Sequence, residues 1–273
     1  MLLAAVLIAF GSGERSERPA AYLGFDRNDY PGDENLQSLR RSFSYCGYWL
    51  NAPPGESQTS WAGKRDVLLR AGFGFTVLFN GRTAAQIKNG GDADAQGKAD
   101  AIVAVSDGRK EGFPLKTVIF LDQEEGGRLL PEQNRYLFAW IDRVATSGFR
   151  AGVYCSAVPF KEASGSVVVT AEDIRRHAGG RQISFWVAND SCPPSPGCSL
   201  GKRVPAPSAS GVEFASIWQF AQSPKRATVA VGCGKSYAPD GNCYPPTADP
   251  KQHMFVDLDS ATCRDPSQGR GSR

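Results

Sequence analysis

Two carboxylates stand two residues apart at the end of an apolar run. Residues 117–127 read Thr-Val-Ile-Phe-Leu-Asp-Gln-Glu-Glu-Gly-Gly, which places Asp122 and Glu124 directly after the apolar residues. Successive side chains on a β-strand alternate between faces, so these two acids point the same way. Confined side by side they repel each other, which separates their pKa values and leaves one protonated and one ionised. Cleavage of a glycosidic bond needs such a pair, although both acids could instead be solvated residues of a strand-end loop.

The elements that must position these acids alternate along the chain between short apolar runs and helical stretches. We expect helices at residues 36–40, 61–71, 92–108, 131–147 and 171–177. We expect strands at residues 22–26, 45–49, 74–79, 150–155, 182–188, 214–220 and 254–259, in addition to the strand that carries Asp122 and Glu124. Eight strands with mostly helical crossovers predict an α/β fold, a TIM-type (β/α)8 barrel. Its last units are irregular, because a Cys-rich stretch without a helical pattern separates the final two strands.

A doubly wound sheet is the alternative architecture, and it predicts a Gly-rich phosphate turn after the first strand. No such turn is present, and residues 232–236 resemble a phosphate-binding loop without its first glycine. Within the barrel, Ala95, Ala99, Ile102 and Val103 indicate the buried face of the helix at 92–108. The buried face expected for the helix at 131–147 consists of Tyr136, Leu137, Trp140, Ile141 and Val144.

Active sites of such barrels lie at the C-terminal ends of the strands, and acidic residues occur there repeatedly. Asp26 ends the first strand, and Asp122 and Glu124 end the fourth. Asp257 and Asp259 end the eighth. The candidate substrate-binding side chains near this mouth are Trp186, Trp218 and Gln219. The two indole rings could stack on sugar faces, or could instead pack within the barrel or against the helix layer.

Composition excludes some classes of protein and favours others. The chain has 273 residues, 41% of them hydrophobic, and a net charge of +3 from 31 basic and 28 acidic residues. Because no Lys/Arg cluster with interleaved aromatics is present, we do not expect a nucleic-acid partner. The apolar residues 1–10 are too few to span a bilayer but match the apolar part of a secretory signal. We therefore expect residues 1–20 to be a signal peptide or leader, residues 21–262 to form the barrel domain, and residues 263–273 to be a polar tail. Export to the bacterial envelope or medium is the expected location, and a monomer the expected state.

Seven cysteines support export to an oxidising compartment. Cys192 and Cys198 bracket one short loop, and Cys233 and Cys243 bracket another, which suits disulfides. Zinc is the alternative, but the chain has no C-x2-C and only two histidines. The pairing of the remaining three, Cys46, Cys155 and Cys263, is left open by the sequence.

An ordered set of short motifs resembles glycoside hydrolase family 25, the lysozyme family with a (β/α)8-like barrel. Besides Asp122-Gln-Glu124, the motifs are Gly24-Phe-Asp26, Gly152-Val-Tyr154, Trp186-Val-Ala188, Trp218-Gln-Phe220 and Val256-Asp-Leu-Asp259. A related glycoside-hydrolase-like group, domain of unknown function family 1906, also resembles the chain in Asp92-Ala-Asp94 and Gly112-Phe-Pro114. The resemblance extends over roughly residues 22–261.

This resemblance implies a role for each matching residue. Glu124 corresponds to the proton donor, and Asp122 and Asp26 to carboxylates that line the same pocket. The eighth-strand acid corresponds to Asp257, with Asp259 as the other choice, and Tyr154 is placed among the substrate-binding residues. Family 25 cleaves the β-1,4 bond between N-acetylmuramic acid and N-acetylglucosamine. The chain departs from the family near the third strand, where Arg82 could lower a carboxyl pKa, bind an anionic substrate group, or be a solvated loop residue.

Three functions remain open from the sequence. The first is an exported glycoside hydrolase acting on cell-wall polysaccharide, without a cofactor and with Glu124, Asp122, Asp26 and Asp257 as its catalytic residues. The second is a non-catalytic cell-wall saccharide-binding module that depends on Trp186 or Trp218. The third is a hydrolase that uses Ca²⁺ or Mg²⁺ held by the clustered carboxylates.

Overall fold

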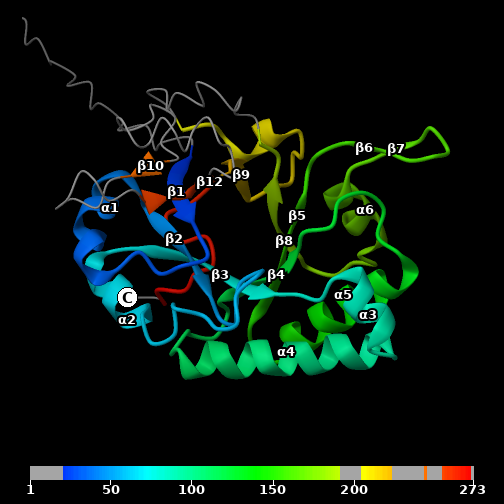
Figure 1. Ribbon diagram of the computed structural model, residues 1–273, viewed down its shortest axis with the longest axis horizontal. Helices are drawn as coiled ribbons and strands as arrows, with labels where there is room; N and C mark the ends of the chain where they lie inside the picture. Colours follow the sequence, from blue (N-terminus) through cyan, green and yellow to red (C-terminus); the bar gives the residue numbers. More distant parts are fainter. Residues whose placement is uncertain (1–20, 191–203, 223–242, 245–253, 272–273) are drawn as a thin grey trace, which may run out of the picture.

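Eight strands form a closed barrel, in the order β1-β12-β9-β8-β5-β4-β3-β2. The computed structural model describes residues 21–190, 204–222, 243–244 and 254–271 (Figure 1). The barrel strands are β1 (Tyr22–Asp26), β2 (Tyr45–Trp49), β3 (Gly74–Asn80), β4 (Val118–Gln123), β5 (Arg150–Ser156), β8 (Ser184–Ala188), β9 (Ile217–Ala221) and β12 (Asp257–Ala261). Seven of them run parallel, and the fold is the expected TIM-type α/β barrel.

Helices lie outside the barrel between consecutive strands (Figure 1). The α-helices are α1 (Leu36–Ser42), α2 (Arg65–Ala71), α3 (Ala84–Asn89), α4 (Ala93–Lys110), α5 (Pro131–Ala145) and α6 (Thr170–His177). Two short 3-10 helices are η1 (Asp33–Asn35) and η2 (Pro207–Ser210). Two small two-stranded sheets pair β6 (Phe160–Lys161) with β7 (Val167–Val168) and β10 (Cys243–Tyr244) with β11 (Met254–Phe255). None of the helices in the described part of the chain combines the length and the apolar character needed to cross a membrane.

The last barrel strand runs opposite to the expected direction. β12 is antiparallel to both of its neighbours, β1 and β9, and its register places Asp257 opposite Asp26 and Ala261 opposite Tyr22. The start of β12, and not its end, therefore lies at the mouth of the barrel, where the blue β1 and the red β12 are side by side (Figure 1). Only parallel strands require a crossover connection, which is why the missing helical pattern before this strand fits an antiparallel pairing.

Two glycines make room for large side chains inside the barrel. A Cβ atom on Gly24 would lie 2.2 Å from the ring of Tyr45, and one on Gly152 would lie 2.4 Å from the ring of Phe120. Phe120 in turn packs edge-on against Trp186, with ring centroids 5.8 Å apart. These fully buried rings fill the barrel below its mouth, so the floor of the mouth is solid.

Helix α4 turns a different face toward the protein than its apolar residues indicate. Ile102 and Val103 are about half exposed, and Ala95 and Ala99 are exposed as well, whereas the small residues between them are buried. The buried side chains of α4 are Ala93, Gln96, Gly97, Ala101, Ala104, Val105 and Gly108. A Cβ atom on Gly97 would lie 2.2 Å from the carbonyl oxygen of Tyr136, so small residues allow α5 to approach closely. The face expected for α5 is buried as predicted.

The expected polar tail is packed into the base of the barrel as far as it is described. Ser267 is fully buried; its backbone N–H donates to Phe75 O (2.8 Å), and its carbonyl accepts from Val118 N (2.8 Å). Its hydroxyl accepts from Val77 N at 2.8 Å. Residues 263–271 thus satisfy backbone groups at the amino ends of β3 and β4, opposite the mouth.

The cysteines that the structure describes with their side chains are free thiols. Cys46 and Cys155 are buried and Cys263 is exposed. Burial raises the pKa of the Cys46 and Cys155 thiols, so both remain protonated and behave as apolar core side chains. The expected disulfide partners Cys192, Cys198, Cys233 and the side chain of Cys243 lie outside the described residues, as do the leader at 1–20 and the loop-like residues 232–236.

Candidate active site

A cavity of about 560 Å³ occupies the mouth of the barrel. Strand register brings its residues together: Asp122 on β4 lies beside Tyr154 on β5, and Asp26 on β1 lies opposite Asp257 on β12. The lining residues are Asp26, Arg27, Asn28, Asp29, Trp49, Pro54, Leu78, Asp122, Glu124, Tyr154, Trp186, Gln219, Gln222 and Asp257. All four candidate catalytic acids therefore face one cavity.

Glu124 lies where this cavity meets two smaller ones. A cavity of about 300 Å³ shares Glu124, Tyr154 and Gln222 with it. Another of about 240 Å³ shares Pro54, Asp122 and Glu124. Since Glu124 lines all three, an extended ligand could pass over its carboxyl group and continue on either side.

The two acids of the D-x-E segment occupy different environments. Asp122 is the last but one residue of β4 and only 5% exposed, whereas Glu124 follows the end of the strand and is exposed. Burial raises the pKa of Asp122 well above its usual value, and the charges of Glu124 and Asp26 raise it further. Asp122 therefore keeps a proton at pH values where an ordinary aspartate is ionised. Glu124 is the carboxyl group of the pair that a ligand can reach.

A second buried acid pair lies beneath the mouth. Burial raises the pKa of Asp26 to about 6, with a hydrogen bond from Gln219 acting in the opposite direction. Burial and the charge of Asp26 raise the pKa of Asp259 well above its usual value. Asp259 therefore keeps its proton at pH values where an ordinary aspartate is ionised. The indole Nε1 of Trp186 donates to Asp259 Oδ1 at 3.1 Å. Asp259 is fully buried and does not line the cavity, so it supports Asp26 from below.

The loop that carries Glu124 is fixed by the next residue. The carboxylate of Glu125 accepts hydrogen bonds from the backbone N–H of Ala84 at 3.0 Å and from the side-chain amide of Gln133. Ala84 begins α3 and Gln133 lies in the first turn of α5, so the negative charge sits at a helix N-terminus, where it is favourable. Two helices thereby hold the backbone next to Glu124.

The tryptophans are placed differently from each other. Trp186 lines the cavity but is 1% exposed, and its ring meets Tyr154 edge-on at 5.1 Å. Trp218 does not line the cavity; its Nε1 donates to Asn189 O at 2.9 Å, while Gln219, next on β9, lines the cavity. Alternation along a strand sends one of two adjacent residues outward, and here that residue is Trp218.

Several cavity-lining residues were absent from the sequence-based site. Trp49 ends β2, beside the end of β1, and its Nε1 donates to Arg27 O at 3.2 Å. Its place at a strand end was the signal that could have identified it. Asn28, Asp29 and Gln222 come from loops after strands, where the sequence gives no periodicity to follow.

Arg82 is paired away from the candidate catalytic acids. Its guanidinium donates to both carboxylate oxygens of Asp100 on α4, at 2.6 and 2.8 Å. The hydroxyl of Tyr136 also donates to Asp100, at 2.8 Å. Arg82 lines the 240 Å³ cavity, but its charge is matched by Asp100 and not by Asp122 or Glu124. The structure gives Arg82 a role beyond the three interpretations above: its ion pair with Asp100 ties the loop after β3 to α4.

The third function left open by the sequence uses a metal ion held by the carboxyl groups of the mouth. Within residues 21–190 and the other described stretches, no three acidic, histidine or cysteine side chains are arranged to hold a metal ion. Of the acids that line the mouth, Asp26 and Asp257 accept hydrogen bonds from Gln219, and Asp122 keeps its proton.

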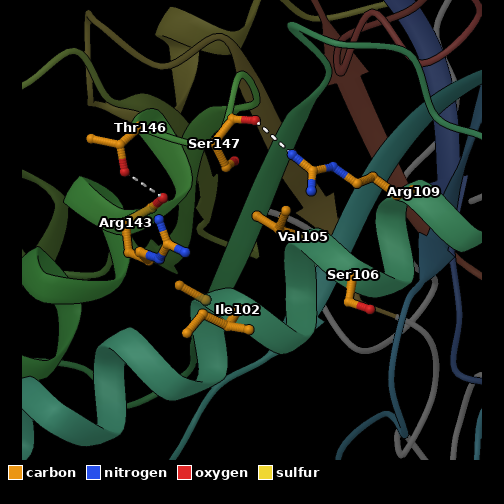
Figure 2. A pocket seen from close by; sticks show the side chains of 8 residues that line it. Ile102, Val105, Ser106, Arg109, Arg143, Thr146 and Ser147 are labelled. Atoms are coloured by element: carbon orange, nitrogen blue, oxygen red, sulfur yellow. Dashed lines mark hydrogen bonds between the residues drawn. The ribbon is translucent and has the colours of Figure 1, made fainter.

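A further cavity of about 400 Å³ lies far from the acids, between α4 and the C-terminal end of α5 (Figure 2). It is lined by Ala101, Ile102, Val105, Ser106, Arg109, Arg143, Thr146 and Ser147. Arg109 donates to Ser147 O at 3.0 Å, as Figure 2 shows, and both arginines lie in the last turns of their helices. Cations there complement the helix dipoles, which accounts for their presence without a ligand.

Comparison with known proteins places the fold. No protein-family model and no curated protein matches the sequence. Among solved structures, an uncharacterized protein of B. stearothermophilus is similar with a TM-score of 0.53 and 18% identity, over 88% of this chain and 95% of that one. The Clostridium perfringens spore cortex lytic enzyme SleM is similar with a TM-score of 0.52 and 14% identity, over 90% of this chain and 69% of that one.

The Streptococcus pneumoniae virulence factor GHIP, a glycosyl hydrolase 25, is similar with a TM-score of 0.52 and 11% identity. The match covers 87% of this chain and 86% of that one. At these identities the likeness concerns the fold: the chain has a barrel like those of family 25 proteins.

Proposed function

We propose that this chain is a glycoside hydrolase that acts on bacterial cell-wall polysaccharide. The observation that carries the proposal is the position of Glu124: an exposed carboxyl group at the junction of three cavities, beside the buried acid Asp122. A polymer that occupied the cleft would present its bonds to this group. Glycosidic bond cleavage is the chemistry for which an accessible acid among further carboxyl groups is suited.

In the proposed reaction Glu124 donates its proton to the glycosidic oxygen as the bond from that oxygen to the anomeric carbon breaks. Water supplies the hydroxyl group that the anomeric carbon receives, and the second proton of that water restores the acid. Asp122, which keeps its proton, donates a hydrogen bond that positions the reacting sugar. Asp26, ionised above about pH 6, and Asp257 supply negative charge toward the oxocarbenium-like state.

The substrate class is supported by the kind of protein that shares the barrel. SleM is a spore cortex lytic enzyme and GHIP a glycosyl hydrolase 25, and both align with most of this chain. The motifs from Gly24 to Asp259 support membership in the related domain of unknown function family 1906. We propose that the protein is exported to the cell envelope or medium, because the apolar residues 1–10 match the apolar part of a secretory signal. Mass spectrometry of the N-terminus after expression in a bacterium tests whether this segment is removed.

A saccharide-binding module without turnover is the second candidate. It is favoured by the protonated state of Asp122, since a neutral group at the base of the cleft cannot stabilise positive charge. In that case binding would depend on the lining of the cavity, Trp186 included, and not on the proton of Glu124.

The test compares release of reducing ends from purified peptidoglycan by the wild-type chain and by Glu124→Gln. Positioned proton transfer contributes about 10²- to 10⁴-fold, so the variant should lose at least about 100-fold in rate with an unchanged melting temperature. Glu172→Gln, which removes one charge from an exposed site on α6, is the matched control. Peptidoglycan pull-down by a wild-type protein that releases nothing would support the binding module instead.

A further inference from the structure

The side-chain amide of Gln219 uses all of its hydrogen-bonding groups at the barrel mouth. Its Nε2 donates to Asp26 Oδ2 at 2.9 Å and to Asp257 Oδ2 at 3.2 Å. Its Oε1 accepts from the hydroxyl of Tyr154 at 2.8 Å and from Gln222 Nε2 at 3.2 Å. An amide has two donor hydrogens and two acceptor lone pairs, so Gln219, which is 2% exposed, is saturated by these four partners.

Its neighbours determine which way the amide points. A flipped amide would turn its oxygen toward Asp26 and Asp257, which accept hydrogen bonds when ionised and would then repel it. Burial raises the pKa of Tyr154 well above its usual value, so this hydroxyl keeps its proton and remains a donor to Oε1. Carboxylates on one side and a permanent hydroxyl donor on the other select a single orientation.

Within the described residues, no positive charge acts on Asp26 in place of this amide, because Arg27, which lines the same cavity, pairs with Asp29 at 3.8 Å. The titratable groups that face it are Asp257 and Asp259 on β12, Asp122 on β4, Tyr154 on β5 and Tyr45 on β2. Every one of these is acidic. Asp26 and Asp257 are moreover direct cross-strand partners, and like charges in such positions repel. A neutral group with two N–H donors between them offsets that repulsion.

We infer that Gln219 is a positioning residue whose amide holds the carboxyl groups of Asp26 and Asp257 together in one orientation and favours the ionised form of Asp26, with Tyr154 fixing the amide. Gln219 thus acts through the carboxyl groups and does not serve as a contact for the saccharide. The inference rests on the proposed function for its catalytic meaning, while the arrangement itself can be tested without turnover.

The first test is an NMR titration of the aspartate carboxyl carbons in the full chain, with the Asp26 signal assigned from its loss in Asp26→Asn. Gln219→Met keeps the length of the side chain and removes both donors. A hydrogen bond to a charged group is worth roughly one pKa unit, so the Asp26 midpoint should rise by about one unit. Gln182→Met, the same change at an exposed site before β8, should leave the midpoint in place.

Tyr154→Phe is the second variant and removes only the hydroxyl that fixes Oε1. The Asp26 midpoint should rise in this variant too, by less than in Gln219→Met. If Gln219→Met does not fold, Tyr154→Phe decides alone. An unchanged midpoint in every folded variant of this pair overturns the inference.

Kinetics on peptidoglycan then separate positioning from substrate contact. In Gln219→Met the acidic limb of the pH–rate profile should move to higher pH and kcat should fall about tenfold, with KM changed by less than about threefold. A rise in KM with unchanged kcat would mark Gln219 as a substrate contact and overturn the inference. A wild-type chain without hydrolysis would refute the proposed function, and the titration would still decide the role of Gln219.

Discussion

Asp26 is a carboxyl group whose burial should destabilise the folded protein at neutral pH. Its pKa is raised from an ordinary value of 3.8 to about 6, chiefly by burial. Because the folded state binds this proton more tightly than the unfolded state, the stability that Asp26 contributes is complete below about pH 4. It is lost as the pH rises through about 6.

The replacement Asp26→Asn removes this pH-dependent loss of stability, because an asparagine side chain does not ionise. The shift from 3.8 to about 6 corresponds to about 2.2 pH units, and one unit is worth about 1.36 kcal/mol. The free energy of unfolding of the variant, relative to wild type, should therefore rise by about 3 kcal/mol between pH 4 and pH 7. Hydrolysis of peptidoglycan should be lost in the same variant, since the proposed reaction uses the ionised form of Asp26.

Urea unfolding at pH 4, 5, 6 and 7 measures this difference, and Gln182→Met shows the effect of a substitution that removes no titrating group. The reasoning requires that the stability difference between Asp26→Asn and wild type increase with pH, mostly between pH 4 and 6. A difference that stays constant, or that decreases as the pH rises, would refute it.

Three further substitutions test how the barrel and its mouth are built. Ser267→Ala leaves the buried N–H of Val77 without a partner and should cost about 1–3 kcal/mol in urea unfolding; unchanged stability would mean that the C-terminal segment does not close the base of the barrel. Glu125→Gln replaces the carboxylate that accepts hydrogen bonds from Ala84 N and Gln133 Nε2, and should lower the free energy of unfolding by about 1.5–3 kcal/mol and reduce kcat on peptidoglycan. Wild-type stability and kcat in this variant would mean that Glu125 does not position Glu124. Gly152→Ala places a methyl group 2.4 Å from the ring of Phe120 and should lower stability by about 1–3 kcal/mol, whereas an unchanged melting temperature would show that the ring has room to move.

Periodicity predicted the barrel and the facing of the D-x-E acids correctly. The alternation of strands and helices gave the fold class, and parity along β4 brought Asp122 and Glu124 to one cavity. Both predictions use the side-chain periodicity of a single strand or helix, which can be read from the sequence of that element alone. The direction of β12 does not follow from such rules, because its own residues look the same whichever way the strand runs. Only the absence of a helical pattern before it pointed to an antiparallel strand.

Errors arose where packing outweighs hydrophobicity. Ile102 and Val103 appeared to mark the buried face of α4, yet close contact with α5 selects small residues such as Gly97 instead. Trp218 and Gln219 were both expected near the mouth, but alternation along β9 turns only Gln219 into it. The C-terminal segment reads as polar because its contribution is hydrogen bonding to strand ends, which composition does not reveal.

Digestion of purified peptidoglycan in water enriched in ¹⁸O, followed by mass spectrometry of the released fragments, tests the central claim most directly. If Glu124 is the proton donor for hydrolysis, the wild-type chain should release fragments whose new reducing end carries one ¹⁸O atom. The rate of their release should fall at least about 100-fold in Glu124→Gln. Labelled fragments released equally by both proteins, or by neither, would contradict the account.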